Sequence, residues 1–331
     1  MKKSYSLSKS LIPSHFVSKH WDIYPKNFKN TLFDKDKLSC FRDNKLSFKC
    51  NDSLEKRKKN KALSVFKNLS QITNPEFIEK NKEVKVGNPK TFSVDKKLYD
   101  YHDLFLIYFL DVLFPFINER SKKNDKTFIA EIGGGYGGLI YKIKRLFPNT
   151  TCILFDLPET NFVSNYYIKT LDSDAKILNL EKILKLKKIK NIKELAIKKN
   201  DLIEYDYVIL PGYLLENFVG NFVDIFINTR SFMEMNLQTI SFYFYSIQKL
   251  ISSNGLFYCV NRYKKVTSGD NVKFKKFPFD NFWEEIIFRK SFCQPMIHEG
   301  LFVRKESENL ILKKKLSKLK PYDVEFFKSF I

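Results

Sequence analysis

Residues 128–138, FIAEIGGGYGG, constrain the fold of this chain more than any other stretch. A short apolar run ends at the acidic Glu131, and five glycines follow within the next seven positions. An apolar run that closes on glycines is typical of a buried strand that turns sharply into a helix. Gly133, Gly135 and Gly138 have the spacing G-x-G-x-x-G, which lets backbone approach a ligand and lets the helix pack closely on the strand. We therefore predict a ligand site at this turn.

A second short apolar strand, CILFD at 152–156, ends at Asp156. A carboxylate at the end of the second strand can accept hydrogen bonds from two ribose hydroxyls. Together the two strands predict a cofactor that contains a nucleoside, held at the carboxyl edge of a parallel sheet. The glycine spacing alone does not choose the cofactor, because nicotinamide and flavin proteins share it.

Glu131 narrows the choice of cofactor. It lies two residues before the first glycine, where its charge would repel the pyrophosphate of a dinucleotide. It suits S-adenosylmethionine, which carries an ammonium and a sulfonium group. The pattern strand-E-x-G-x-G-x-x-G followed by strand-Asp resembles class I methyltransferases. The cofactor-binding candidates are Glu131, Gly133, Gly135, Tyr136, Gly138, Asp156, Leu157 and Asn228.

The net charge of +21 comes from 58 Lys and Arg against 37 Asp and Glu. A strongly basic chain invites a nucleic-acid interpretation. Most of these cations are lysines spread along the whole chain, however, so we expect no nucleic-acid site. Peripheral attraction to an acidic membrane surface stays open. The oligomeric state is not predicted.

No apolar run reaches the roughly 18–20 residues of a membrane span, and the N-terminus lacks the pattern of a signal peptide. We therefore expect a cytoplasmic protein without a transmembrane segment. The five cysteines are scattered and include no C-x-x-C pair, which predicts reduced thiols and no zinc site.

The chain divides into an N-terminal lobe, expected to be helical (1–90), a main domain (91–305) with a lysine-rich insertion (171–204), and a basic helical tail (306–331). Apolar periodicity predicts a long buried helix from about Asp95 to Asn118, on which His102 is a candidate site residue. The insertion is expected to form one or two amphipathic helices. Further helices are predicted at 139–146, 161–171 and 237–251, the last ended by Asn254-Gly255. Further strands are predicted at 207–210, 223–229, 256–262, 282–292 and 297–305.

Several motifs in order resemble a family of sugar O-methyltransferases from polysaccharide-biosynthesis clusters. They are EIGGGYGGL at 131–139, DLPET at 156–160, VDIFINTRSFMEM at 223–235, YCVNR at 258–262 and IHE at 297–299. The resemblance implies an α/β, Rossmann-like class I methyltransferase fold, with a seven-stranded, mostly parallel sheet whose last strand is antiparallel. It also implies S-adenosylmethionine-dependent methylation of a sugar hydroxyl in capsule or O-antigen biosynthesis, on a sugar, nucleotide-sugar or glycan substrate.

An alcohol loses its proton as it attacks a methyl group, so a positioned general base is expected. Glu234, in the loop after the fourth predicted strand, is the first candidate. Ser231-x-x-Glu234 also matches a capping box, in which the glutamate only fixes a helix start, although Asn236 offers a competing cap. His298 is the second candidate, because imidazole suits proton transfer near neutral pH. No spacing of carboxylates argues for a metal.

Other functions stay open. An RNA or DNA methyltransferase often has a polar-Pro-Pro-aromatic turn after strand four, where this chain reads Asn228-Thr229-Arg230-Ser231. A non-catalytic partner protein with a methyltransferase fold would not need the intact glycines and both acids. A nicotinamide oxidoreductase is disfavoured by Glu131.

Overall fold

The structure of the chain, a computed structural model, describes residues 1–13, 16, 32–42, 56–265, 271–292, 294 and 296–319, and for 56–59 only the backbone. The predicted tail at 306–331 is therefore described only as far as Leu319. Of the five cysteines, Cys50 and Cys293 lie outside the described residues, and Cys40, Cys152 and Cys259 are free thiols.

The described N-terminal residues form short helices and a hairpin. These elements are α1 (Lys2–Ser10), α4 (Lys35–Ser39), α5 (Lys56–Ile72), α6 (Pro75–Asn81), β1 (Thr91–Val94) and β2 (Lys97–Asp100). Strands and helices then alternate along the chain. They are α7 (Tyr101–Lys123), β3 (Thr127–Ile132), α8 (Gly138–Leu146), β4 (Thr150–Asp156), α9 (Pro158–Leu171), β5 (Ile177–Asn179), α10 (Leu180–Lys187), β6 (Ile197–Lys198), β7 (Tyr207–Pro211), β8 (Phe218–Val219) and β9 (Val223–Thr229). The remaining elements are α11 (Leu237–Leu250), β10 (Ile251–Arg262), β11 (Trp283–Lys290), β12 (Ile297–Arg304) and α12 (Ile311–Lys318).

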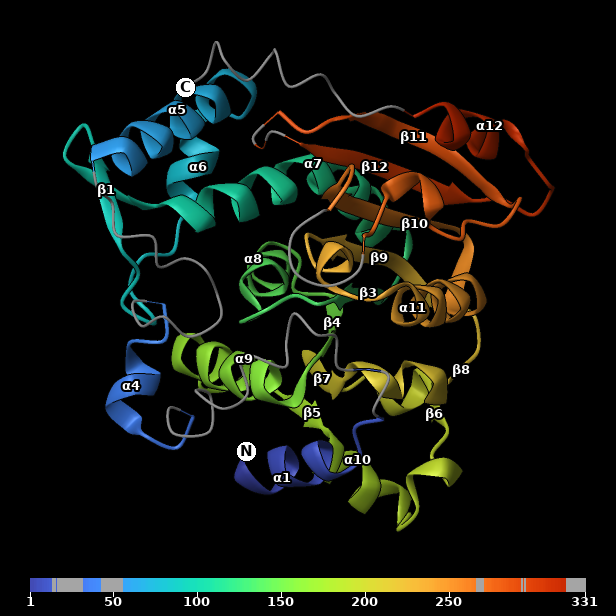
Figure 1. Cartoon of the computed structure of the whole chain (residues 1–331). Coiled ribbons are helices and arrows are strands. Elements are labelled where there is room, and N and C mark those ends of the chain that lie inside the picture. Colours follow the sequence, from blue (N-terminus) through green and yellow to red (C-terminus); the bar gives the residue numbers. More distant parts are fainter. Residues whose placement is uncertain are drawn as a thin grey trace.

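One central sheet runs through the molecule in the order β11-β12-β10-β9-β3-β4-β7-β5 (Figure 1). Its strands are parallel except β12, which is antiparallel to both of its neighbours. The predicted α/β, Rossmann-like class I methyltransferase fold, with an antiparallel last strand, is confirmed. The strand count differs from the seven expected, because β5 at the start of the lysine-rich insertion pairs with β7 and adds an eighth strand at the edge.

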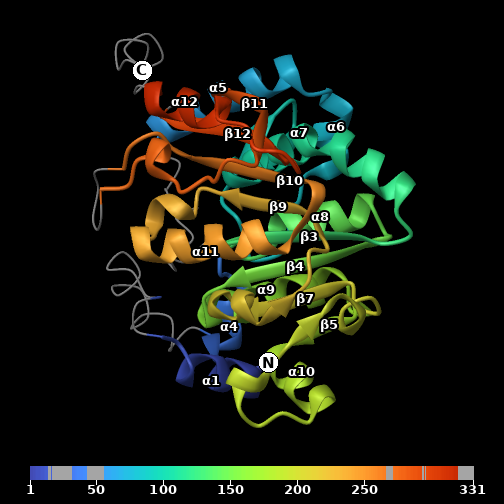
Figure 2. The ribbon, with the colours of Figure 1, turned by 90° about the vertical axis from the view of Figure 1, so that its right-hand side faces the viewer.

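Helices cover both faces of this sheet, with α7, α8 and α9 on one side and α11 on the other (Figures 1 and 2). The central strand β3 is buried along its whole length, as expected for a parallel strand between two helical layers. Its side chains alternate between two apolar cores: Ile129 packs with α7 and α8, whereas Phe128 and Ala130 pack on the α11 side. The carboxyl ends of β3, β4 and β9 therefore meet at one edge, between the two helical layers.

The long predicted helix begins later than the sequence indicated. Residues 91–100 form the β1–β2 hairpin, whose two turn residues, Asp95 and Lys96, have φ of 47° and 63°. Positive φ at both turn residues matches the twist of a two-residue hairpin. Helix α7 starts only at Tyr101, because the Asp100 carboxylate accepts the backbone N–H groups of His102 and Asp103 and caps it. It continues to Lys123 rather than Asn118.

Two other boundaries also differ. Helix α11 ends at Leu250, not at Asn254-Gly255, and β10 begins at Ile251 with an irregular register before Leu256. Asn254, with φ of 57°, lies within this irregularity. In the lysine-rich insertion the structure has a single α-helix, α10, with Leu180 and Ile183 buried. The 3-10 turns Ile192–Glu194 and Lys199–Asp201 complete the segment.

Buried ion pairs tie the N-terminal residues to the main domain. Arg42 is fully buried and pairs with Glu83 and with Asp100, the residue that caps α7, at 2.5 Å in each case. In the same region Lys142 of α8 pairs with Asp103 of α7 at 2.7 Å. Buried charges are tolerated only when paired in this way. The start of α7, the helix α8 and the N-terminal segment are therefore fixed together.

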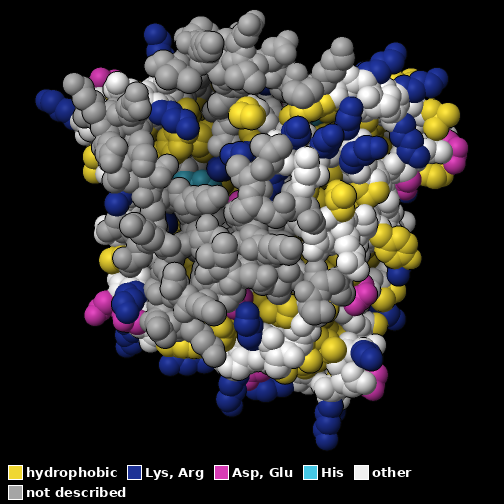
Figure 3. All heavy atoms as spheres, in the orientation of Figure 1, with side chains coloured by type: hydrophobic (Ala, Val, Ile, Leu, Met, Phe, Trp, Pro, Cys, Tyr) yellow, Lys and Arg dark blue, Asp and Glu magenta, His cyan; other side chains and the backbone are white. Residues whose placement is uncertain are grey.

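Within the described residues, α7 is long and apolar enough to cross a membrane by length and composition. A 56% share of its most apolar window is buried inside the molecule, and interior helices pass the same test. The face shown in Figure 3 has Lys and Arg side chains over many of its parts rather than in one patch.

Candidate active site

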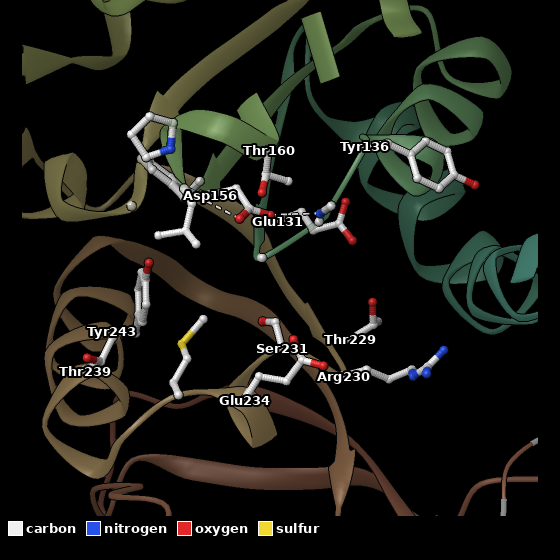
Figure 4. A pocket seen from close by; sticks show the side chains of 18 of the residues that line it. Glu131, Tyr136, Asp156, Thr160, Thr229, Arg230, Ser231, Glu234, Thr239 and Tyr243 are labelled. Atoms are coloured by element: carbon white, nitrogen blue, oxygen red, sulfur yellow. Dashed lines mark hydrogen bonds between the residues drawn. The ribbon is translucent and has the colours of Figure 1, made fainter. Parts of the chain in front are cut away.

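A pocket opens at the carboxyl edge where β3, β4 and β9 end (Figure 4). Its walls come from the glycine turn, the start of α9, the loop after β9, the first turns of α7 and the start of α11. Of the predicted residues, those that line it are Glu131, Gly133, Gly135, Tyr136, Asp156, Leu157, Glu234 and the weaker candidate His102. The structure thus brings together predicted site residues that are as far apart in the sequence as His102 and Glu234.

The glycine turn follows β3 in a conformation that requires glycine. Gly133, Gly135 and Gly137 have φ of 70°, 62° and 83°, values that residues with a side chain rarely adopt. A Cβ at Gly133 would also lie 2.2 Å from the Ser231 hydroxyl oxygen. Gly138 has a different role. It does not line the pocket, and a Cβ there would lie 2.6 Å from Leu106, so it serves the close packing of α8 on α7.

Asp156 connects the end of β4 to this turn. Its carboxylate accepts the backbone N–H of Gly135 at 2.9 Å and that of Leu157 at 2.7 Å. Burial raises the pKa of Asp156 to about 7, although these hydrogen bonds favour the charged form, and the nearby charge of Glu234 adds to the rise. The carboxylate is therefore held in place at the pocket wall, poised to bind hydroxyl or cationic groups.

Glu131 is a buried acid at the end of β3. Its side chain is buried, and among the described residues its Oε2 has no hydrogen-bond partner. Burial, together with the negative charge of Asp156, raises the pKa of Glu131 to about 8. The negative charges of these two buried acids repel each other at one pocket wall. A ligand that brings positive charge and hydrogen-bond donors would stabilise both.

Tyr136 lines the pocket from inside the glycine turn, and its ring packs on Tyr167 at 4.8 Å and on Phe41 at 5.5 Å between ring centroids. Asn228, in contrast, does not line the pocket. Its amide donates to the carbonyl of Ile132 and to the Ser231 hydroxyl, so it holds the loop after β9 against the end of β3. Asn228 was predicted to contact the cofactor, but in the structure it supports the loop that lines the pocket.

Glu234 lies at the pocket in a short 3-10 turn, Phe232–Glu234. The alternative capping box does not form: Ser231 makes no side-chain cap and its hydroxyl donates to the Ile132 carbonyl instead. The cap of α11 is Asn236, which accepts the backbone N–H of Thr239 at 2.7 Å. Glu234 is thus a carboxylate that lines the pocket and takes no part in capping α11.

The structure does not bring His298 to the pocket. It lies in β12, buried between the rings of Phe274 and Phe288, at 4.6 Å and 4.3 Å between centroids. Burial lowers its pKa to about 4. Its position fits a packing role. The structure therefore does not support His298 as the second candidate for the general base.

The sequence interpretation missed most of one pocket wall. The first turns of α7 contribute aromatic and apolar side chains: Tyr101, Phe105, Leu106 and Phe109. Arg230 lies opposite, directly after β9, with a positive φ of 66°. The available signal was position, because a residue that directly follows a parallel strand lies at the sheet edge where ligands bind. Among the missed residues on the other side are Tyr213, Thr239 and Tyr243.

One comparison with known protein families agrees with this geometry. The model of an O-methyltransferase domain matches residues 120–193, which include Glu131, the glycine turn and Asp156. No functionally curated protein matches the chain.

Solved structures of methyltransferases are similar at low identity. Mitomycin 7-O-methyltransferase MmcR is 11% identical, with a TM-score of 0.36, over 75% of this chain and 70% of that chain. The S-adenosylmethionine-dependent methyltransferase SibL is 9% identical, with a TM-score of 0.37, over 85% of this chain and 77% of that chain. Geranyl diphosphate C-methyltransferase from Streptomyces coelicolor A3(2) is 11% identical, with a TM-score of 0.35, over 64% of this chain and 86% of that chain. Likenesses at these TM-scores carry no argument about activity.

The pocket residues fit S-adenosylmethionine. Glu131 offers a buried carboxylate oxygen that has no hydrogen-bond partner among the described residues, Asp156 offers a second carboxylate, and Gly133 and Gly135 line the pocket without side chains. These acceptor oxygens match an ammonium group and ribose hydroxyls, and their negative charge opposes a pyrophosphate. The cofactor is S-adenosylmethionine, and the domain match at 120–193 supports O-methyltransferase activity.

Proposed function

We propose that this protein transfers a methyl group from S-adenosylmethionine to a sugar hydroxyl in the synthesis of a cell-surface polysaccharide. The observation that carries the proposal is one continuous pocket in which the cofactor wall, Glu131 and Asp156, faces an acceptor wall with Glu234, Arg230 and the aromatic face of α7. The sugar assignment is supported by the motif resemblance to sugar O-methyltransferases. Flat aromatic side chains such as Tyr101 and Phe105 can cover the apolar face of a sugar ring.

Each pocket residue has a part in this account. Glu131 binds the cofactor ammonium, Asp156 binds the ribose hydroxyls, and the glycine turn lets the backbone approach the ligand. S-adenosylmethionine, when bound, supplies an electrophilic methyl group. Glu234 would accept the proton of the attacking hydroxyl, and the new O–CH₃ bond would replace the S–CH₃ bond, with S-adenosylhomocysteine as the leaving group. The apolar side chains of α7 exclude water from the acceptor.

A second acceptor class is favoured by one specific observation. Tyr101 and Phe105 pack edge to face at 5.0 Å between ring centroids, and with Phe109 they form an aromatic wall that would also hold a phenol ring. A small aromatic hydroxyl compound is therefore the alternative substrate. Nucleic acid is not proposed as substrate, because the lysines are spread along the whole sequence and the pocket is lined mainly by apolar side chains.

The test is an acceptor panel. Purified protein with S-adenosylmethionine is offered nucleotide sugars, cell-derived glycan, simple phenols and RNA, and products are identified by mass spectrometry. We expect methylation of a sugar-containing acceptor, and transfer to a phenol alone would favour the alternative. Methylated RNA would contradict both. We further propose that the enzyme works in the cytoplasm, where cell fractionation should find it, with or without weak attachment to acidic membrane surface.

A further inference from the structure

Arg230 is the single lysine or arginine among the described residues that line the pocket, in a chain with 58 such residues. Its backbone N–H donates to the carbonyl of Val260 at 2.7 Å, which fixes the residue to the end of β10. Its φ of 66° is uncommon for a residue with a side chain, and strained backbone of this kind concentrates at functional sites. The structure thus keeps a cation at this place at a conformational cost.

The guanidinium is directed to the acceptor end of the pocket. Its central carbon lies 5.7 Å from the ring centroid of Phe105 on α7, a cation–π arrangement that orients the planar group. In Figure 4 the Arg230 side chain extends away from Asp156. The cation therefore lies beside the aromatic wall, not beside the ribose-binding acid.

The two ends of the pocket differ in electrostatic character. Two acids interact at the cofactor wall, since the negative charge of Asp156 contributes to the raised pKa of Glu131. At the other end, burial and the positive charges of Arg230, Arg42 and Lys142 together lower the pKa of His102 to about 3. Arg42 and Lys142 are paired with buried acids behind the pocket wall, whereas Arg230 lines the pocket itself. The acidic end matches the cationic cofactor, and the opposite end matches negative charge.

We propose that Arg230 binds an anionic group, a carboxylate or a phosphate, on the sugar that this pocket methylates. The inference deepens the proposed function and rests on it. A guanidinium presents parallel N–H donors to either group, in a geometry that lysine cannot reproduce. An anion at Arg230 would fix the sugar ring against Tyr101 and Phe105 and leave a hydroxyl facing the cofactor. Specificity for an acidic sugar over a neutral one would follow.

The test uses the full-length protein saturated with S-adenosylhomocysteine, titrated with glucose, glucuronate and glucose 6-phosphate by calorimetry. At least one anionic sugar should bind about 10-fold or more tightly than glucose, the scale of a charge-assisted hydrogen bond in a pocket. Which of the two binds better separates a carboxylate from a phosphate. Equal affinity for all three sugars, including no measurable binding of any, would overturn the proposal.

Matched variants test whether Arg230 causes the preference for an anionic sugar. Arg230→Gln should remove the preference for the anionic sugar, and Arg230→Lys should keep only part of it. Arg262→Gln, which removes an arginine outside the pocket, should leave the preference unchanged. Each variant is first titrated with S-adenosylhomocysteine, because retained cofactor affinity shows an intact pocket. A preference that survives in Arg230→Gln would contradict the inference.

Failure of this inference is distinguishable from failure of the proposed function. Methyl transfer to a neutral sugar at equal rates in wild type and Arg230→Gln would overturn the role of Arg230 and leave sugar O-methylation standing. Wild-type protein that does not bind S-adenosylhomocysteine would remove the basis of both.

Discussion

The backbone N–H of Gly135 donates to the carboxylate of Asp156 over 2.9 Å, which joins the glycine turn to the end of the neighbouring strand. The same carboxylate accepts the N–H of Leu157 at 2.7 Å. Asp156 is therefore both a ligand-binding acid and a brace for the turn that shapes the pocket. Its removal should change the pocket in two ways at once.

Asp156→Ala should weaken S-adenosylhomocysteine binding by roughly 1.5–3 kcal/mol, the scale for losing charge-assisted hydrogen bonds. Isothermal titration measures the change. Asp174→Asn, at an exposed site that does not line the pocket, is the matched control and should bind as wild type. Unchanged affinity in Asp156→Ala would mean that the ribose lies elsewhere.

Glu131 should make the cofactor-free protein less stable as the pH rises. Its folded-state pKa of about 8 lies above the ordinary value of 4.5, so the folded state holds this proton more tightly than the unfolded state. The stabilisation is complete below the ordinary pKa and is lost as the pH rises through about 8. The melting temperature of wild type, relative to Glu131→Gln, should therefore fall between about pH 5 and pH 8.5.

The cofactor should reverse this trend, because its ammonium favours the charged form of Glu131. S-adenosylhomocysteine should raise the melting temperature of wild type more at pH 8 than at pH 6, and Glu131→Gln should show little such difference. A wild-type curve parallel to that of Glu131→Gln at all pH values, with and without ligand, would contradict the assignment.

Gly133→Ala and Gly137→Ala form a matched pair. Both glycines have positive φ, 70° and 83°, so both alanines should cost about 1–2 kcal/mol through backbone strain. Only at Gly133 does the new Cβ meet a close atom, the Ser231 hydroxyl at 2.2 Å, whereas the nearest atom at Gly137 is 3.5 Å away. Urea unfolding should show the larger loss for Gly133→Ala, together with lost cofactor affinity. Equal losses would show that the contact with Ser231 is easily relieved.

The alternation of strands and helices was readable from the sequence because buried parallel strands are short apolar runs bounded by turn residues. The predicted bounds of strand β9 match the structure, and Glu131, Gly133, Gly135 and Asp156 lie at the pocket because a β-strand followed by glycines has few alternatives. Local patterns failed where two structures compete for the same residues. The segment 95–100 has helical periodicity, yet the turn at Asp95 and Lys96 and the cap at Asp100 place it in a hairpin.

The direction in which a side chain points also could not be predicted from the sequence. His298 and Asn228 lie at plausible sequence positions, but the sheet directs His298 between two phenylalanine rings and Asn228 onto the Ile132 carbonyl. The aromatic wall of α7 was counted as core, because periodicity does not distinguish a face that packs on the sheet from one that borders a cavity. The sequence places Arg230 only in a loop after a strand, and the fold shows that this loop lines the pocket.

Glu234→Gln tests the proposed general base. Turnover should fall by about 10²–10⁴, the usual contribution of such a group, while cofactor affinity and the melting temperature stay near wild type. Single-turnover rates at saturating cofactor make the comparison, and Glu216→Gln, an exposed glutamate outside the pocket, serves as control. Wild-type turnover in Glu234→Gln would move the role of base to His102, the other titratable pocket residue near the acceptor wall.

The central claim is the transfer of a methyl group to a sugar oxygen. Its most direct test supplies methyl-¹³C S-adenosylmethionine to the protein with glycan and nucleotide sugars from the source cells, and locates the label by NMR. The account predicts labelled O-methyl groups on a sugar, formed with wild type and formed more slowly with Asp156→Ala when the cofactor is below saturation. Label on nitrogen, on carbon or on a phenol, or no label with protein that binds the cofactor, would contradict it.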